Sequence, residues 1–244
     1  MRYVPGGSTP TGILNGADYE LWNPETDSYV SNYSVADFAG KKLNKEALQK
    51  ELGLPVDGSI PLFGSIGRLV EQKGVDILQA AVPEMMNEKL QFVLLGNGTH
   101  ETENVFQGFQ ERFPRQIAVR TGFDESLSHR IEAGADFFLM PSRFEPCGLN
   151  QMYSLRYGTI PVVHATGGLD DSVIDIRADL EKANGIKFHN YSSSALLKAI
   201  RKAMALYSEP ELFHRFRLNG MSADFSWNRT AKEYLRIYEL ASGI

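Results

Sequence analysis

From residue 61 onward, short apolar runs rich in β-formers alternate with amphipathic stretches of helical length. This alternation is typical of a parallel sheet covered by helices on both faces, because parallel strands are joined by crossovers that are usually helical. We therefore expect an α/β fold with a doubly wound parallel sheet, and 43% hydrophobic residues are enough to fill its core. The predicted strands cover residues 60–66, 91–95, 117–121, 136–141, 159–165 and 185–188.

Helices are predicted between these strands and throughout the C-terminal tail, where apolar residues recur at helical spacing. Ser192, Ser193 and Ser208 are candidate N-caps, because a serine hydroxyl can accept a hydrogen bond from a free amide of the first turn. The predicted helices cover residues 75–87, 102–113, 126–133, 149–157, 193–207, 210–221 and 228–241. Residues 1–12 are interpreted as a flexible lead or a cloning remnant, and residues 13–244 as one domain.

The overall composition argues against several classes of protein. A net charge of -5 and a pI near 5.6 disfavour a nucleic-acid-binding surface, which ordinarily carries a basic stripe. No segment approaches the roughly 20 apolar residues that span a bilayer, so no membrane partner is expected. Cys147 is the one cysteine, which excludes an internal disulfide, and the five histidines are too scattered for a structural zinc site. The expected location is the cytoplasm, or a plastid in a plant or alga.

Glycine-bearing loops follow five of the predicted strands, at the sheet edge where open parallel sheets bind ligands. In the first of these loops, Arg68 and Lys73 lie between Gly67 and Gly74. Two cations over a backbone that can be approached closely are able to hold a diphosphate and neutralise its charge as it leaves. The alternative is a solvated loop with two ordinary surface cations.

The fourth loop, residues 142–149, is expected to open a helix with Pro146 at the first helical position. The amides at such a helix terminus attract a phosphate or a sugar oxygen. Glu145 can accept hydrogen bonds from sugar hydroxyls and favour positive charge at the anomeric carbon, or it can simply complement the helix dipole. Thr166 and Gly167 begin the same arrangement one strand later.

Other candidate residues have less specific surroundings. Phe123, at a strand end, can stack on a purine base or pack into the core. No histidine adjoins Cys147 in the sequence, so nucleophilic catalysis by its thiol is not expected. No Asp-x-Asp pair ends an apolar strand, so we expect neither a metal nor another cofactor. His129 and Arg130 are expected to support the sheet from a helix, without touching ligand.

Taken together and in this order, these segments resemble the carboxyl-terminal domain of bacterial glycogen synthases and plant starch synthases. The resemblance is carried by GILNG at 12–16, WNP at 22–24, GRL at 67–69, QKG at 72–74, SHRI at 128–131, PSRFEPCGL at 141–149, TGGL at 166–169 and DFSW at 224–227. It implies one half of a GT-B fold, in which two Rossmann-like domains face each other. It also implies retaining transfer of glucose from ADP-glucose to the non-reducing end of an α-1,4-glucan.

By position, the resemblance implies that Arg68 and Lys73 bind the diphosphate and that Glu145 is the donor-site carboxylate; these three are the candidate catalytic residues. Phe123 stands where the family commonly has a tyrosine near the adenine. The candidate nucleotide-sugar-binding residues are Gly67, Phe123, Cys147, Gly148, Leu149, Thr166 and Gly167.

The sequence also departs from the family pattern. The family's amino-terminal domain carries a Lys-x-Gly-Gly loop that this sequence lacks, so the chain is expected to bind ADP or ADP-glucose but to be nearly inactive alone. His164, Thr99 and Asn150 stand where the family usually has arginine, an acidic residue and threonine. Two alternatives stay open: a non-catalytic nucleotide- or glucan-binding module that works with a partner chain, and a GT-B transferase that uses UDP-sugars.

Overall fold

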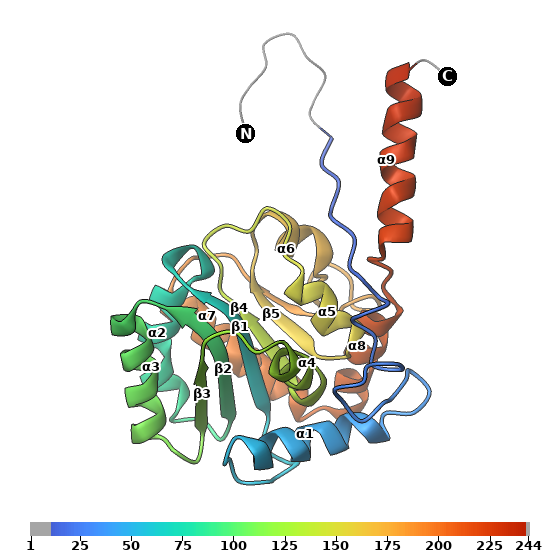
Figure 1. Ribbon diagram of the computed structural model, residues 1–244. Coiled ribbons are helices and arrows are strands. Elements are labelled where there is room, and N and C mark those ends of the chain that lie inside the picture. The colour runs from blue at the N-terminus through green and yellow to red at the C-terminus, as the bar shows by residue number, and fades with distance from the viewer. Residues whose placement is uncertain (1–10, 243–244) are drawn as a thin grey trace.

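The computed structural model describes residues 11–242 as a parallel sheet between layers of helices (Figure 1). The strands are β1 (Leu62–Leu69), β2 (Gln91–Gly98), β3 (Ile117–Thr121), β4 (Phe137–Met140), β5 (Ile160–His164) and β6 (Ile186–Phe188). They form one six-stranded sheet in the order β3-β2-β1-β4-β5-β6, and all its pairs are parallel. The predicted doubly wound sheet is confirmed. Most of the predicted lead at residues 1–12 lies outside the described residues.

All six predicted strands are present, but the first two run further than their apolar segments. β1 and β2 pair in parallel register as far as Leu69 and Gly98, so backbone hydrogen bonds extend both strands into glycine-rich sequence. Gly67 and Arg68, which were expected in a loop, therefore lie in β1. This pairing places Arg68 opposite Asn97.

Seven of the helices match the predicted ones to within a few residues, and the sequence patterns miss two others and a 3₁₀ turn. The helices are α1 (Ala39–Glu51), α2 (Val75–Met85), α3 (His100–Arg112), α4 (Glu125–Gly134), α5 (Asn150–Arg156), α6 (Gly167–Ser172), α7 (Ser193–Tyr207), α8 (Pro210–Ser222) and α9 (Trp227–Ser242), with the 3₁₀ turn η1 at Glu71–Lys73. No range was predicted for α1 or α6, although a helix start was expected at Thr166 and Gly167, where α6 begins. The buried face of α1 carries Lys41, Asn44 and Lys45, so it lacks the apolar stripe that predicts a helix.

One of the three predicted N-caps is correct. The Ser192 hydroxyl accepts a hydrogen bond from the Ala195 amide at 3.2 Å and so caps α7. Ser193 is already the first helical residue, and Ser208 follows the last turn of α7. Proline opens α8 instead, as suits a position whose amide has no partner within the helix.

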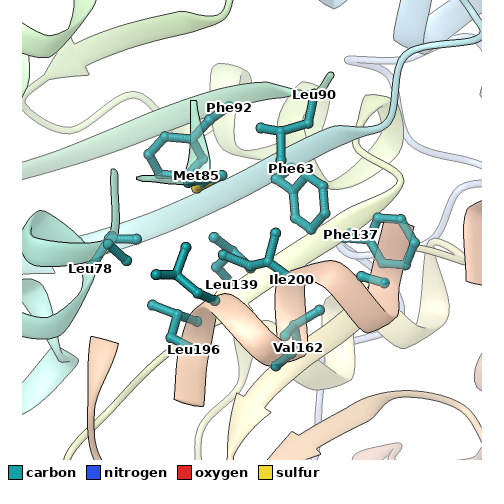
Figure 2. Packing of buried hydrophobic residues seen from close by; sticks show 14 of the residues in the cluster. Phe63, Leu78, Met85, Leu90, Phe92, Phe137, Leu139, Val162, Leu196 and Ile200 are labelled. Atoms are coloured by element: carbon teal, nitrogen blue, oxygen red, sulfur yellow. The ribbon is translucent and has the colours of Figure 1, made fainter. Parts of the chain in front are cut away.

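Helices pack on both faces of the sheet. On one face, Phe63, Phe92 and Phe137 of the strands pack with residues of α2 and α7, such as Met85 and Ile200 (Figure 2). On the other face, a second cluster joins strand side chains to apolar residues of α1, α4 and α6. A sheet buried on both faces explains why its strands are nearly continuous apolar runs.

A buried ionic cluster fastens α1 and α8 to the amino-terminal end of the sheet. The Asp136 carboxylate, just before β4, accepts from Lys45 Nζ at 2.6 Å, from an Arg217 guanidinium nitrogen at 2.8 Å and from the Leu62 amide at 2.9 Å. Leaving any of these charges buried without a partner would be costly. The cluster lies at the end of the strands opposite the glycine-bearing loops, so it supports the fold without occupying the ligand edge.

His129 and Arg130, which were expected to support the sheet from a helix, have polar and stacking partners in the amino-terminal segment and α1. The His129 ring stacks on Trp22 at 3.8 Å between ring centroids, and its Nδ1 lies 2.7 Å from Asp27 Oδ2. Arg130 makes two hydrogen bonds to the Glu51 carboxylate, at 2.8 and 2.9 Å. Both residues therefore attach the amino-terminal segment and α1 to α4.

Helix α9 extends away from the sheet layers, beside the N-terminal segment (Figure 1). Of its described residues, Thr230 alone is buried. A short parallel bridge between Ala17 and Ser226 joins the two segments below it. No helix between residues 11 and 242 combines the length and apolarity needed to cross a membrane.

The carboxyl group of Glu132 makes the stability of the fold depend on pH. Burial raises the pKa of Glu132 to about 8, although the Ser154 hydroxyl, which donates to it at 2.8 Å, opposes that shift. Because the pKa of Glu132 is higher in the folded protein than in the unfolded chain, the protonated carboxyl group stabilises the fold. This stabilisation is complete below the usual glutamate pKa and is lost as pH rises through the folded-state pKa. Wild-type stability should therefore fall between pH 5 and pH 9.

Glu132→Gln should abolish this part of the pH dependence, because glutamine keeps an oxygen that accepts from Ser154 and does not titrate. Urea unfolding of both proteins at pH 5, 7 and 9 measures the effect. The wild type should lose on the order of 3–5 kcal/mol relative to the variant over that range. Equal pH slopes for the two proteins would show that Glu132 does not carry the effect.

Candidate functional site

The strand order reverses between β1 and β4. The chain moves outward from β1 through β2 and β3, and then returns to place β4 on the other side of β1. Such a reversal leaves a crevice at the carboxyl ends of the two central strands, because the loops that follow them turn in opposite directions. The first and fourth predicted loops, at the ends of β1 and β4, are the two that border this crevice.

Gly74 allows these two loops to touch. Its φ of 76° is in the left-handed region, and a Cβ on it would lie 2.0 Å from the Pro141 carbonyl oxygen. The Arg143 amide also donates to the Gln72 carbonyl at 2.9 Å. The end of η1, with Lys73, is thereby held against the loop that follows β4.

Lys73 and Glu145 form an ion pair across the crevice. Lys73 Nζ lies 2.5 Å from Glu145 Oε2, and the Ser142 hydroxyl donates to the same oxygen at 3.3 Å. The Glu145 side chain is 8% exposed and that of Lys73 is 32% exposed. Charges interact more strongly in such partly buried surroundings than in water, and solvent reaches the pair mainly from the lysine side.

Arg68 stands beside this pair without a carboxylate of its own. Its side chain is exposed, and its guanidinium lies 3.4 Å from Gln72 Oε1. None of the carboxylates between residues 11 and 242 forms an ion pair with it. An exposed guanidinium without a carboxylate partner can bind a phosphate through two parallel hydrogen bonds.

A cavity of about 260 Å³ opens between the end of β1 and the start of α5. Five predicted site residues line it: Gly67, Arg68, Lys73, Gly148 and Leu149. Apolar side chains of β1, β2 and β4 form much of the rest of its wall. The structure thus brings together the two cations and part of the loop after β4, and Glu145 reaches the same place through Lys73.

The loop after β4 does not run directly into a helix, contrary to the prediction. Helix α5 begins at Asn150, so Pro146 precedes it and is not the first helical residue. Gly148, with a φ of 75°, turns the chain between them. Gln151 Nε2 closes this turn by donating to the carbonyl of Gly148 at 3.1 Å and to the preceding carbonyl at 3.0 Å.

The turn nevertheless leaves three backbone amides beside the crevice without a protein acceptor in residues 11–242. Among the residues that the structure describes, no acceptor bonds the amides of Cys147, Gly148 and Leu149. Backbone amides in such a turn can bind an anion without the dipole of a long helix. These three amides stay candidate ligands for a phosphate or a sugar oxygen.

Thr166 and Gly167 lie against the backbone of Glu145. Gly167 has a φ of 47°, and a Cβ there would lie 2.2 Å from the Glu145 carbonyl oxygen. The Gly168 amide donates to that same oxygen at 3.0 Å. Thr166 is half-buried beside them. The loop after β5 therefore buttresses the candidate carboxylate, although it does not line the cavity.

Phe123 and Cys147 occupy different surroundings from the central residues. Phe123 is 89% exposed, so the alternative of core packing is wrong, and its ring does not line the cavity. The Cys147 thiol is half-buried, and burial raises its pKa, although the hydrogen bond from the Asn15 amide opposes the shift. A raised thiol pKa favours the neutral form, which is a poor nucleophile.

Sequence patterns miss the polar contacts that hold the site together. Ser142 precedes Arg143 in the fourth loop, but its spacing does not show that its hydroxyl reaches Glu145. Gln72 contributes its backbone carbonyl, which has no sequence signal at all. In the described part of the chain, no three His, Cys, Asp or Glu side chains are arranged to hold a metal ion. That no cofactor is needed stays a prediction.

Comparisons with known proteins agree with this arrangement. Residues 44–221 match the family described as glycosyl transferases group 1. The chain is 52% identical over 228 residues to a glycogen synthase of Anaeromyxobacter sp. (strain Fw109-5), covering 93% of this chain and 48% of that protein. It is 50% identical over 234 residues to a glycogen synthase of Nitrosomonas europaea, covering 94% and 47%.

A solved structure gives the same picture in three dimensions. The catalytic domain of starch synthase IV from Arabidopsis thaliana, bound to ADP and acarbose, superposes with a TM-score of 0.89 at 39% identity. The match covers 96% of this chain and 49% of that one, and the chain spans about half the length of the curated relatives it matches. The chain therefore belongs to the group 1 glycosyl transferases, and its sheet corresponds to one half of a GT-B fold.

Proposed function

We propose that this chain is the donor-binding part of a glycogen or starch synthase. In this proposal the enzyme transfers glucose, with retention, from ADP-glucose to the non-reducing end of an α-1,4-glucan. The observation that carries the proposal is the placement of Arg68, Lys73 and Glu145 around one crevice at the strand-order reversal. The names of the relatives and the ADP bound in the starch synthase structure support it.

The three side chains suit the charges of this reaction. The bond between the glucose anomeric carbon and the diphosphate oxygen breaks, so negative charge grows on the departing ADP. Arg68 and Lys73 would hold that charge, the guanidinium by two parallel hydrogen bonds and the ammonium as a point charge. The Glu145 carboxylate would favour the positive charge that develops on the sugar and would accept hydrogen bonds from its hydroxyls. With two cations present, we propose no metal.

The acceptor glucan needs a second wall. The described residues border the crevice from one side, and transfer between two substrates requires both to be held in a fixed geometry. We propose that a facing domain completes the cleft and that the described part alone binds donor but turns over slowly. The expected cytoplasmic or plastid location stays a prediction.

Arg68→Ala and Lys73→Ala should each weaken ADP binding about 10- to 150-fold, because each removes one charge-assisted phosphate contact. Isothermal titration calorimetry of the chain with ADP measures the change. Arg201→Ala is the matched control, since Arg201 is an exposed arginine of α7 paired with Glu84 and Glu88, away from the crevice.

The absence of measurable heat with millimolar ADP in the wild type would count against the proposal, as would an equal loss of affinity in Arg201→Ala. Competition between ADP-glucose and UDP-glucose for the same protein separates the proposed donor from the UDP-sugar alternative.

Glu145→Gln should strengthen binding of ADP about threefold, because the carboxylate competes with the diphosphate for Lys73 and repels it. ADP-glucose should gain less, or lose affinity, because the variant also weakens hydrogen bonds to the sugar hydroxyls. Titrating both ligands into both proteins gives the comparison. Equal gains for the two ligands would mean that Glu145 does not contact the glucose.

A further inference from the structure

His164, the last residue of β5, lies buried beneath the loops of the crevice with an exposed fraction of 8%. Its Nδ1 lies 2.8 Å from the Ser142 carbonyl oxygen, after β4, and its Nε2 lies 3.2 Å from the His189 carbonyl oxygen, after β6. The ring thus spans the ends of three neighbouring strands. It contacts neither the cavity nor the Lys73–Glu145 pair directly.

The two partners of His164 fix the charge that the ring must carry. A carbonyl oxygen can only accept a hydrogen bond, so each ring nitrogen must donate. A neutral imidazole has one N–H group and one bare nitrogen, whereas the imidazolium ion has two N–H groups. Both bonds can therefore exist together only while His164 is protonated.

The bond to Ser142 is one of three that fix the turn carrying Glu145. The Arg143 amide donates to the Gln72 carbonyl, and the Gly168 amide donates to the Glu145 carbonyl, at 2.9 and 3.0 Å. One bond ties the turn to the 3₁₀ turn after β1, and the other two tie it to the end of β5 and to the start of α6. Of the three donors, the imidazole is titratable and the two backbone amides are not.

We propose that His164 is a positioning residue of the donor site, whose doubly donating imidazolium form holds the Ser142–Glu145 turn and so sets the Glu145 carboxylate against Lys73. The proposal rests on the donor-binding function proposed above. A neutral ring has one N–H for two carbonyl oxygens, so it no longer ties the Ser142 carbonyl to the end of β6, and the turn loosens. Affinity for ADP-glucose, whose glucose Glu145 is proposed to contact, should consequently be lower at a pH where the ring carries a single proton.

Aromatic rings and several charged groups surround His164. The ring packs against Phe188 and Tyr191, with centroids 5.4 Å away in both cases. Tyr191 donates a hydrogen bond to Asp76, and the Arg143 guanidinium stacks on its ring. The other titratable and charged groups on the adjoining elements are the His189 side chain and three ion pairs: Glu71 with Arg143, Glu145 with Lys73, and Lys187 with Asp170. A test must hold all of these constant while changing His164 alone.

His164→Arg provides that test, because arginine stays protonated and offers several N–H donors at every accessible pH. Affinity for ADP-glucose is measured by calorimetry for both proteins at pH 5.5, 7.0 and 8.5, because ADP alone lacks the glucose that Glu145 is proposed to contact. The ratio of the two affinities cancels the titration of the ligand itself and of the shared neighbours. Wild-type affinity relative to the variant should fall about fivefold from pH 5.5 to pH 8.5. A ratio that is constant over this range overturns the proposal.

A second measurement needs neither ligand nor variant. Nitrogen-15 NMR of the ring in the wild-type chain reports whether each nitrogen carries a proton. Both should be protonated at pH 5.5, and the Arg143 amide, next to Ser142, should shift with the same midpoint as the ring. A bare ring nitrogen at pH 5.5 would overturn the role of His164. A total lack of ADP binding would instead overturn the donor-binding function, so the two failures are distinguishable.

Discussion

The ion pair between Lys73 and Glu145 is the interaction on which the candidate site depends. It joins the loop after β1 to the loop after β4, which belong to opposite halves of the sheet. A diphosphate that enters the crevice must share Lys73 with Glu145, so binding exchanges one anionic partner for another. Lys73 and Glu145 thus neutralise each other, and Arg68 is still able to bind a further negative charge.

Backbone geometry makes this pair possible. At Gly74 and at Gly167 a side chain would collide with a carbonyl of the facing loop, so glycine permits the close approach of three loops. The Ser142 carbonyl oxygen in turn lies within hydrogen-bond distance of the His164 ring. At the other end of the strands, the Asp136 cluster fastens α1 and α8 without involving the crevice. The ionic cluster and the candidate site therefore lie at opposite ends of the strands.

The sheet and most of its helices could be predicted because their signals are local. Apolar runs and helical periodicity mark all six strands and seven helices. Sequence patterns miss α1 because most of its buried side chains are polar, and Lys45 has its charged partner far away in the sequence. The extension of β1 through Arg68 depends likewise on β2, which no local pattern contains.

For the candidate site, the sequence predicted that Arg68, Lys73 and Glu145 lie at one end of the sheet, but it did not predict their contacts or that Arg68 belongs to β1. Arg68, Lys73 and Glu145 meet because parallel strands end at one edge, which sequence order already implies. The bonds from Ser142 and His164 depend on tertiary distances, and the turn at Gly148 displaces the expected helix start from Pro146. Phe123 lies outside the cavity, so its role rests on the family resemblance alone.

A crystal structure of this chain with ADP bound tests the central claim most directly. The diphosphate should lie within hydrogen-bond distance of both the Arg68 guanidinium and Lys73 Nζ, with Lys73 drawn away from Glu145. A diphosphate bound elsewhere, or one that leaves both cations without contact, would contradict the account.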